Sequence, residues 1–166
     1  MSTIYSKFKS ITTLLFDVDG VFTNSDILIT EDGNLLRSMS TQDGLAVKRA
    51  IRNNFNLAII TKGSSKGVTS RLEGLDVLDI YTAVDNKEET FNNYISKKGI
   101  SPDQCLYMGD DLSDISVLKL VGIASCPSDA VHEVKSHCNY ISPYKGGFGC
   151  VRDVIERTLR SNGKWS

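Results

Sequence analysis

Short apolar runs rich in β-forming residues alternate with amphipathic stretches along most of this chain. The runs are Thr13–Phe16, Leu57–Ile60 and Cys105–Met108, and a stretch with helical spacing of apolar residues follows each of them. This alternation is typical of βαβ units, in which parallel strands form one sheet covered by helices. We therefore predict an α/β fold with a Rossmann-like, three-layer αβα arrangement around a parallel sheet.

Five stretches have apolar residues at intervals of three and four, which predicts helices. They are Leu45–Asn53, Lys66–Glu73, Lys87–Lys98, Ile115–Leu120 and Val151–Leu159. One segment departs from the alternation, because Asp26–Thr30 and Asn34–Arg37 flank an Asp-Gly turn. Such a turn between apolar runs predicts a β-hairpin, which we expect to extend beyond the main sheet.

Length and charge narrow the kinds of protein that this chain can be. Its 166 residues predict a single domain over residues 1–166. The net charge of -1 favours neither nucleic acid nor an anionic membrane as a partner. No apolar segment reaches the roughly 18 residues of a membrane span, and the first ten residues lack the apolar core of a signal peptide. We expect a cytoplasmic protein that acts on a small molecule.

Carboxylates gather directly after two of the apolar runs. Asp17 and Asp19 follow the first run, and the third is followed by Asp110, Asp111 and Asp114. Ligand sites of open parallel sheets lie at the carboxyl ends of the strands, and carboxylate oxygens suit Mg²⁺. Two simpler interpretations remain open: the first pair could be solvated loop residues, and Asp114 could cap a helix.

A turn containing hydroxyl groups and glycine, Thr61–Ser65, follows the second apolar run. Its backbone N–H groups could hold a phosphate at the start of the next helix, although an ordinary Ser or Thr cap explains the same residues. Lys87 opens a predicted helix, an end at which the helix dipole disfavours a cation. Either Lys87 has a second role there, or it is simply solvated.

The order of these motifs resembles the haloacid dehalogenase-like phosphatase superfamily. The resemblance rests on DVDGVFT, Thr61, Lys87 and GDDLSD, in that order. Longer segments resemble the phosphatases of 3-deoxy-D-manno-octulosonate 8-phosphate and of nonulosonate 9-phosphates within it: EDGNLL, QDGLAVK, GDDLSDISVLKLVGIA and GGFGCVRDVIE. The resemblance covers nearly the whole chain, from about Ile11 to Leu159.

The resemblance implies a covalent mechanism of phosphate ester hydrolysis. Asp17 would be the nucleophile that forms an aspartyl phosphate, and Asp19 the general acid that protonates the leaving alcohol and then activates water. Thr61 and Lys87 would bind the phosphoryl oxygens.

The same resemblance implies a Mg²⁺ cofactor. Its ligands would be the Asp17 carboxylate, the Asp19 backbone carbonyl and the Asp110 carboxylate. Asp111 and Asp114 would support the site by orienting metal-bound water.

The substrate implied by the resemblance is a phosphorylated sugar acid, foremost 3-deoxy-D-manno-octulosonate 8-phosphate. The octulosonate phosphatases typically carry an arginine at three positions that here hold Gln42, Gly63 and Phe148. Part of the lost carboxylate binding could come from other basic side chains, namely Lys62, Lys66 and Arg71. Phe148 could instead pack against a larger nine-carbon sugar acid, so a nonulosonate 9-phosphate is the alternative substrate.

The short distance in sequence between Asp17 and Thr61 leaves room for a hairpin and helices but for no large cap domain. Relatives without a cap close their sites by assembly, so the resemblance implies a homotetramer. Two non-enzymatic alternatives remain: a degenerate regulatory relative, and a receiver-like phosphate-binding domain. A receiver would carry its acceptor aspartate at the end of a central strand. Here Thr61 stands at the end of that strand, Leu57–Ile60, which disfavours the receiver.

Overall fold

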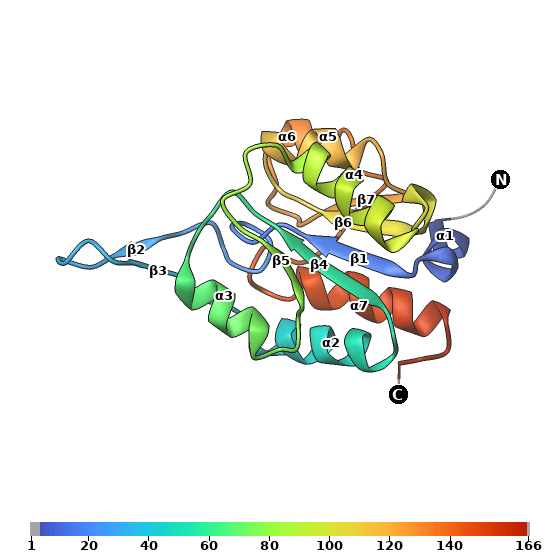
Figure 1. Cartoon of the computed structure of the whole chain (residues 1–166), viewed down its shortest axis with the longest axis horizontal. Coiled ribbons are helices and arrows are strands. Elements are labelled where there is room, and N and C mark those ends of the chain that lie inside the picture. Colours follow the sequence, from blue (N-terminus) through green and yellow to red (C-terminus); the bar gives the residue numbers. More distant parts are fainter. Residues whose placement is uncertain (1–3, 166) are drawn as a thin grey trace.

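A six-stranded sheet lies at the centre of this computed structural model, which describes residues 4–165 (Figure 1). Its strands are β1 (Thr13–Phe16), β4 (Asn56–Ile60), β5 (Asp79–Tyr81), β6 (Cys105–Met108), β7 (Ile123–Cys126) and β8 (Tyr140–Ile141). The strands lie in the order β5-β4-β1-β6-β7-β8, and every neighbouring pair is parallel. The predicted parallel sheet is confirmed.

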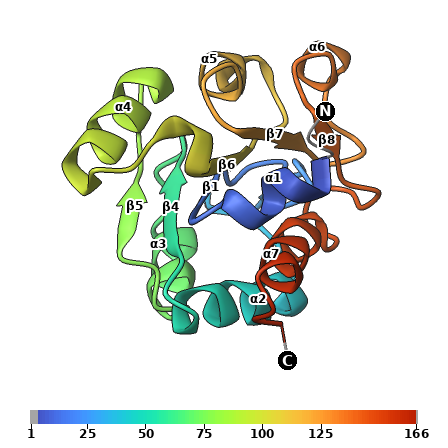
Figure 2. The ribbon, with the colours of Figure 1, turned by 90° about the vertical axis from the view of Figure 1, so that its right-hand side faces the viewer.

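Helices cover both faces of the sheet, as Figure 2 shows. They are α1 (Ile4–Ser10), α2 (Thr41–Arg52), α3 (Lys66–Glu73), α4 (Lys87–Lys98), α5 (Ile115–Leu118), α6 (His132–Lys135) and α7 (Cys150–Ser161). α4, α5 and α6 cover one face, while α2, α3 and α7 cover the other. The three-layer αβα prediction is therefore confirmed. Within residues 4–165, no helix has both the length and the apolar character needed to cross a membrane.

The central strand contributes to both layers of the core because its side chains alternate between the two faces. Leu14 and Phe16 pack in the cluster that contains α2, α3 and α7 residues. Leu15 packs in the opposite cluster, with residues of α4, α5 and α6. All three side chains are fully buried, so β1 is held from both sides and its carboxyl end is a rigid place for a site.

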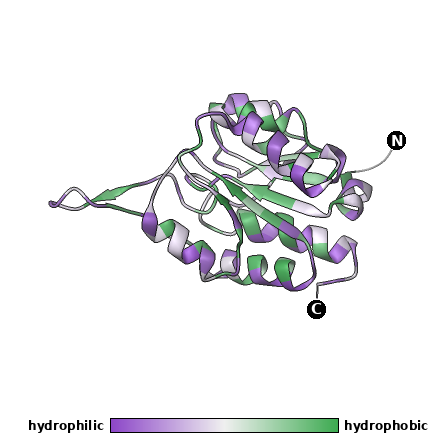
Figure 3. Cartoon of the chain, viewed as in Figure 1, coloured by the Kyte–Doolittle hydropathy of each residue, from purple (hydrophilic) through white to green (hydrophobic). Residues whose placement is uncertain are grey.

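The predicted hairpin is confirmed, although its paired strands are shorter than the sequence indicated. β2 (Leu28–Ile29) pairs antiparallel with β3 (Leu35–Leu36), and Gly33 turns the chain with a φ of 79°. The hairpin projects from the body of the molecule in Figure 1, and its strands are apolar in Figure 3. Between β1 and α2 the described chain inserts this hairpin and no cap domain.

Candidate active site

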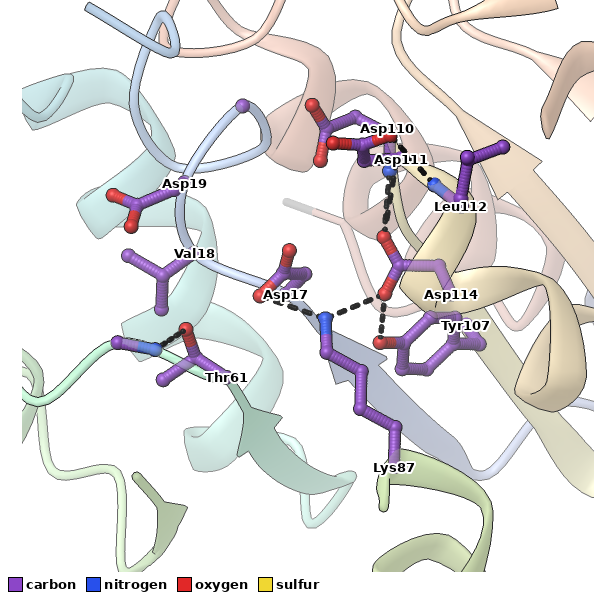
Figure 4. Close-up of polar contacts among 12 residues, drawn as sticks. Asp17, Val18, Asp19, Thr61, Lys87, Tyr107, Asp110, Asp111, Leu112 and Asp114 are labelled. Atoms are coloured by element: carbon purple, nitrogen blue, oxygen red, sulfur yellow. Dashed lines mark hydrogen bonds and ion pairs between the residues drawn. The ribbon is translucent and has the colours of Figure 1, made fainter. Parts of the chain in front are cut away.

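Three neighbouring strands bring the predicted residues to one edge of the sheet. Asp17 follows β1, Thr61 follows β4 and Asp110 comes two residues after the end of β6. Because β4, β1 and β6 are adjacent and parallel, their carboxyl ends meet, and Lys87 reaches the same place from the first turn of α4 (Figure 4). These four residues, which are far apart in the sequence, thus lie at one place in the structure.

The loop after β1 is wound tightly so that Asp17 and Asp110 can lie close together. The Val18 carbonyl accepts hydrogen bonds from three backbone N–H groups, those of Val21, Phe22 and Thr23. Gly20 has a φ of 88°, and a Cβ added there would overlap the Asp110 carboxylate. Glycine at this position therefore serves both the turn and the close approach of the acidic residue.

Lys87 lies between two carboxylates and has almost no exposure to solvent. Its Nζ is 3.1 Å from Asp17 Oδ1 and 2.7 Å from Asp114 Oδ1, and its side chain is 1% exposed. Burial lowers the pKa of Lys87, but the attraction of Asp17 and Asp114 outweighs burial, so the pKa is raised overall. The lysine is therefore held as a cation beside Asp17, which accounts for its place at an unfavourable helix end.

Asp114 connects the lysine to the loop that carries Asp110. Its Oδ1 also accepts a 2.6 Å hydrogen bond from the Tyr107 hydroxyl, and its Oδ2 accepts from the backbone N–H groups of Asp110 and Asp111 at 3.0 and 3.2 Å. Asp114 makes no side-chain cap for α5; it closes the short turn Leu112–Asp114 instead. The side chain thus fixes both Lys87 and the backbone around Asp110.

The acidic residues fit a divalent metal ion. Carboxylate oxygens of Asp17, Asp110 and Asp114 all lie within 4.8 Å of one another. Asp110 Oδ1 is buried and has no hydrogen-bond partner among the described residues. Burial, joined by repulsion from Asp17 and Asp114, raises the pKa of Asp110 to about 8. A cation would supply the missing partner and remove the repulsion.

The ionised form of Asp17 is also disfavoured by burial and by a neighbouring carboxylate. Burial, followed by repulsion from Asp114, raises the pKa of Asp17 to about 6, although Lys87 acts in the opposite direction. Its side chain is 10% exposed, so it remains reachable from the cleft in front of the strand ends. A metal ion and Lys87 together would keep this carboxylate ionised and ready to act as a nucleophile.

The side chain of Asp19 points away from the acidic cluster, as Figure 4 shows. It pairs with Arg37, whose Nε is 2.6 Å from Oδ1 and whose Nη2 is 3.2 Å from Oδ2. Arg37 directly follows β3 of the hairpin and is not among the residues that the sequence predicted for the site. Its only signal in the sequence is a cation at the end of an otherwise apolar hairpin strand.

Thr61 and the residues after it form a cleft with the acidic cluster. Thr61 is buried, and its Oγ1 accepts a hydrogen bond from the Gly63 N–H at 3.2 Å. Ser65 caps α3 by accepting from the Val68 N–H, so the simpler interpretation of a serine cap holds for this residue. The cleft has a volume of about 240 Å³ and is lined by residues that include Asp17, Asp19, Thr61, Lys62, Lys87, Asp110 and Asp111.

The remaining predicted substrate residues fall into two separate places. Lys66 and Arg71 line a larger cavity of about 790 Å³ between the hairpin and α3. Phe148 is 64% exposed and lines a third cavity with Gln42, beside the start of α7. Within one chain the structure does not bring Phe148 to the catalytic cleft.

The glycines before Phe148 have a structural role that the sequence did not reveal. The Gly147 N–H donates to the Val21 carbonyl at 2.9 Å, and a Cβ on Gly146 would overlap the carbonyl of Gly20. This loop therefore packs directly on the loop that carries Asp17 and supports it from behind. Only residues without a side chain permit so close an approach.

Comparison with known proteins agrees with this geometry. Residues 52–154 match the family model of the haloacid dehalogenase-like hydrolases. The 3-deoxy-D-manno-octulosonate 8-phosphate phosphatase KdsC of Salmonella typhi is 32% identical over 97% of this chain and 86% of its own length.

Solved structures of such phosphatases have the same fold. That of the Yersinia pestis phosphatase has a TM-score of 0.94 at 28% identity, covering 97% of this chain and 87% of its own. That of the Moraxella catarrhalis phosphatase, in complex with a magnesium ion, a phosphate ion and KDO, has a TM-score of 0.93 at 31% identity, covering 96% and 92%. The chain belongs to the haloacid dehalogenase-like hydrolases, in the group that contains these octulosonate phosphatases, and it is a phosphoric monoester hydrolase.

Proposed function

We propose that this enzyme hydrolyses a phosphorylated sugar acid, foremost 3-deoxy-D-manno-octulosonate 8-phosphate, with Mg²⁺ as its cofactor and Asp17 as its nucleophile. The observation that carries the proposal is the position of Asp17, which ends the central strand beside Asp110 with Lys87 Nζ 3.1 Å from its Oδ1. A buried carboxylate flanked by a fixed cation and a candidate metal site suits attack on a phosphate ester. The likeness to octulosonate phosphatases supports the choice of substrate.

The reaction proceeds in two steps on the side chains of this cleft. In the first, Asp17 attacks phosphorus, the phosphorus–oxygen bond to the sugar breaks, and Asp19 gives its proton to the departing alkoxide. In the second, Asp19 takes a proton from water, which attacks the aspartyl phosphate and releases inorganic phosphate and free Asp17. Thr61 and Lys87 bind the phosphoryl oxygens through both steps.

Charge neutralisation provides most of the acceleration in this scheme. Acid–base help by a group such as Asp19 contributes about 10²- to 10⁴-fold, far below the ~10²¹-fold that monoester hydrolysis can require. The Asp17 carboxylate, the Asp19 backbone carbonyl and the Asp110 carboxylate would hold Mg²⁺, which would supply positive charge at the phosphoryl group. Lys87 adds a second cation, which Asp114 keeps in place through the 2.7 Å contact. Asp111 supports the site from its exposed position beside Asp110.

A nonulosonate 9-phosphate is the second candidate substrate. At Gly63 a Cβ would lie 3.4 Å from Asp19 Oδ2, so this position is in contact with the proposed general acid, and glycine places no cationic side chain there. Phe148 offers an exposed aromatic surface where the octulosonate phosphatases have another arginine. The loss of the two arginines favours a less densely charged sugar acid, and the aromatic surface of Phe148 suits a larger one.

We propose that four chains assemble and that neighbours complete the open site. Exposed apolar side chains on the projecting hairpin support this proposal, namely Leu28, Ile29, Leu35 and Leu36. The exposed position of Phe148, outside the cleft of its own chain, fits a contact with a neighbour's substrate. All four cysteines are free thiols, which suits the reducing cytoplasm that we propose as its location.

A panel of phosphorylated sugar acids, assayed with and without Mg²⁺, tests the proposed function. We expect Mg²⁺-dependent phosphate release and a higher kcat/KM for 3-deoxy-D-manno-octulosonate 8-phosphate than for a nonulosonate 9-phosphate. The reverse preference would replace the first substrate with the second. Hydrolysis of p-nitrophenyl phosphate without turnover of any sugar acid phosphate would contradict the substrate class and leave the chemistry standing.

A further inference from the structure

Arg37 connects the hairpin to the proposed general acid. Its guanidinium engages both carboxylate oxygens of Asp19, at 2.6 and 3.2 Å, in a two-point ion pair. The Arg37 side chain is 10% exposed, whereas that of Asp19 is 38% exposed. With both oxygens held by Arg37, Asp19 cannot serve a leaving alkoxide, because its carboxylate is turned from Asp17 (Figure 4).

Arg37 also lies at the boundary of two hollows. It lines a small hollow with Asp19 and Thr61, and it lines the cavity of about 790 Å³ with Lys66 and Arg71. That volume lies within the ~300–1,000 Å³ range of small-molecule sites. The guanidinium thus stands between the phosphate-binding cleft and a space large enough for a sugar.

Three cations line the larger cavity: Arg37, which is paired with Asp19, and Lys66 and Arg71. None of the described residues that line it is acidic. Neither Lys66 nor Arg71 forms an ion pair with any residue between positions 4 and 165. Such a surface attracts an anion, and the phosphate of the substrate is already assigned to Thr61 and Lys87.

We propose that Arg37 exchanges partners when the substrate binds: it leaves the Asp19 carboxylate and pairs with the carboxylate of the sugar acid. The exchange frees the exposed Asp19 carboxylate to take up a proton from solvent and to turn toward the leaving oxygen, to which it gives that proton. Recognition of the substrate carboxylate in the cationic cavity is thereby coupled to the chemistry in the cleft. This inference rests on the proposed function, because it requires a phosphorylated sugar acid as the substrate.

The difference in exposure between the two partners explains why an anion is needed. Arg37 is mostly shielded from water, so losing Asp19 without a replacement would leave a desolvated guanidinium unpaired. Asp19 is accessible enough to be hydrated once released, so its release costs less. A sugar phosphate without a carboxylate offers Arg37 no second partner, and Asp19 then stays in the resting pair.

Two substrates that differ only at the carboxylate test this coupling. We would compare kcat/KM for 3-deoxy-D-manno-octulosonate 8-phosphate and for its C1 carboxamide, using the full chain with Mg²⁺. We expect a strong preference for the acid in the unmodified enzyme. Arg37→Gln should reduce the ratio of the two kcat/KM values by about 10- to 100-fold, the effect of losing one hydrogen bond between charged groups. Arg37→Lys should retain part of the preference.

Arg52→Gln is the matched control, because it makes the same chemical change at the exposed end of α2. Its ratio should equal that of the unmodified enzyme. If Arg37→Gln left the ratio of the two kcat/KM values unchanged, even while lowering both values, the exchange would be ruled out. If the unmodified enzyme turned over the acid well but without preference over the amide, this inference alone would fail. If it turned over no sugar acid phosphate, both the inference and the proposed substrate class would fail.

Nuclear magnetic resonance provides a readout that does not depend on turnover. The Arg37 Nε–H signal, assigned by its loss in Arg37→Lys, should shift when the dephosphorylated sugar acid is added to the Mg²⁺-loaded protein. Inorganic phosphate at the same concentration should leave the signal in place. A signal that follows phosphate and ignores the sugar acid would show that Arg37 serves the phosphoryl group, and would overturn the exchange.

Discussion

Lys87 donates a hydrogen bond to Asp114, with 2.7 Å between Nζ and Oδ1, and the two side chains are 1% and 0% exposed. The pair links the start of α4 to the loop after β6, next to the proposed nucleophile. Lys87 also has Asp17 beside it at 3.1 Å. Asp114, however, has further donors to satisfy, because it accepts from the Tyr107 hydroxyl and from two backbone N–H groups of the Asp110 loop. Disturbing a buried network of this kind is far costlier than disturbing a pair at the surface. The lysine proposed to bind the phosphoryl group is therefore also a structural residue.

Asp114→Asn should lower the free energy of unfolding by about 3 kcal/mol, because the amide NH₂ would face a donor on either side: Lys87 and Tyr107, or the backbone N–H groups of the Asp110 loop. Asp76→Asn is the matched control, because Asp76 pairs with Lys48 at 3.5 Å with the side chains 63% and 35% exposed. A surface pair contributes about 0–1 kcal/mol, so the control should unfold almost like the unmodified protein. Urea titration without Mg²⁺ measures both values. Equal losses in the two variants would show that burial of the Lys87 pair has no special cost.

The acidic cluster predicts a pH-dependent effect of Mg²⁺ on stability. Burial, joined by repulsion from neighbouring carboxylates, raises the pKa of Asp110 to about 8 and that of Asp17 to about 6 from the ordinary value of 3.8. A raised pKa in the folded state contributes stability that is complete below the unfolded pKa and is lost as pH rises through the folded value. The metal-free protein should therefore lose stability from about pH 4 to about pH 8.

Mg²⁺ binds the ionised carboxylates, so it should offset this loss. The increase in Tm on adding MgCl₂ is expected to grow between about pH 5 and pH 8, because protons compete with the metal at the lower pH. Thermal unfolding at matched ionic strength, with NaCl in the metal-free samples, measures the effect. A Tm increase that stayed constant or shrank with rising pH would contradict the role of Asp17 and Asp110 as metal ligands.

Gly20→Ala should abolish metal binding and activity, because the added Cβ would overlap the Asp110 carboxylate. Gly33→Ala is the matched control: its φ of 79° is close to the 88° of Gly20, but nothing lies within 4 Å of its added Cβ. Both variants acquire the left-handed backbone strain, about 1–2 kcal/mol. Only Gly20→Ala should lose affinity for Mg²⁺ in calorimetric titration. Similar affinities in the two variants would show that the close approach is unimportant.

The strands that the sequence predicted best are those buried on both faces. β1 and β6 lie where the apolar runs indicated, because every residue in them is buried and the pattern has no competing explanation. β5 and β8 lie at the edges of the sheet with partly exposed residues, so no apolar run marks them. α2 begins at Thr41, earlier than predicted, because Ser40 caps it by accepting from two backbone N–H groups.

The close approach of residues at the strand ends was predictable, since the carboxyl ends of adjacent parallel strands lie at one edge of the sheet. This holds for Asp17, Thr61 and Asp110. Arg37 was not predictable, because it reaches Asp19 from the hairpin. The spacing of apolar residues in the sequence does not indicate in which direction the hairpin leaves the sheet. The separation of Phe148 from the cleft likewise depends on how the last loop packs against Gly20 and Val21.

The hairpin predicts how the protein assembles. Leu28 and Leu36 are 67% and 48% exposed and belong to a group of exposed apolar side chains on the projecting hairpin, and a group of this kind is expected to be covered by another subunit, whereas a single exposed leucine is not. Leu28→Asp combined with Leu36→Asp should convert a tetramer into smaller species in light scattering. Leu78→Asp is the control, because Leu78 is 92% exposed but lies far from the hairpin in sequence, just before β5. A monomeric mass for the unmodified protein would contradict the assembly.

The most direct test of the central claim is to trap the phosphorylated enzyme. Acid quenching during steady-state turnover of a phosphate ester, followed by peptide mass spectrometry, should locate the phosphoryl group on the Asp17 side chain. Asp17→Asn, shown to be folded and to bind Mg²⁺, should carry no phosphoryl group and release no phosphate. A phosphoryl group on another residue, or near-normal turnover by Asp17→Asn, would show that Asp17 is not the nucleophile.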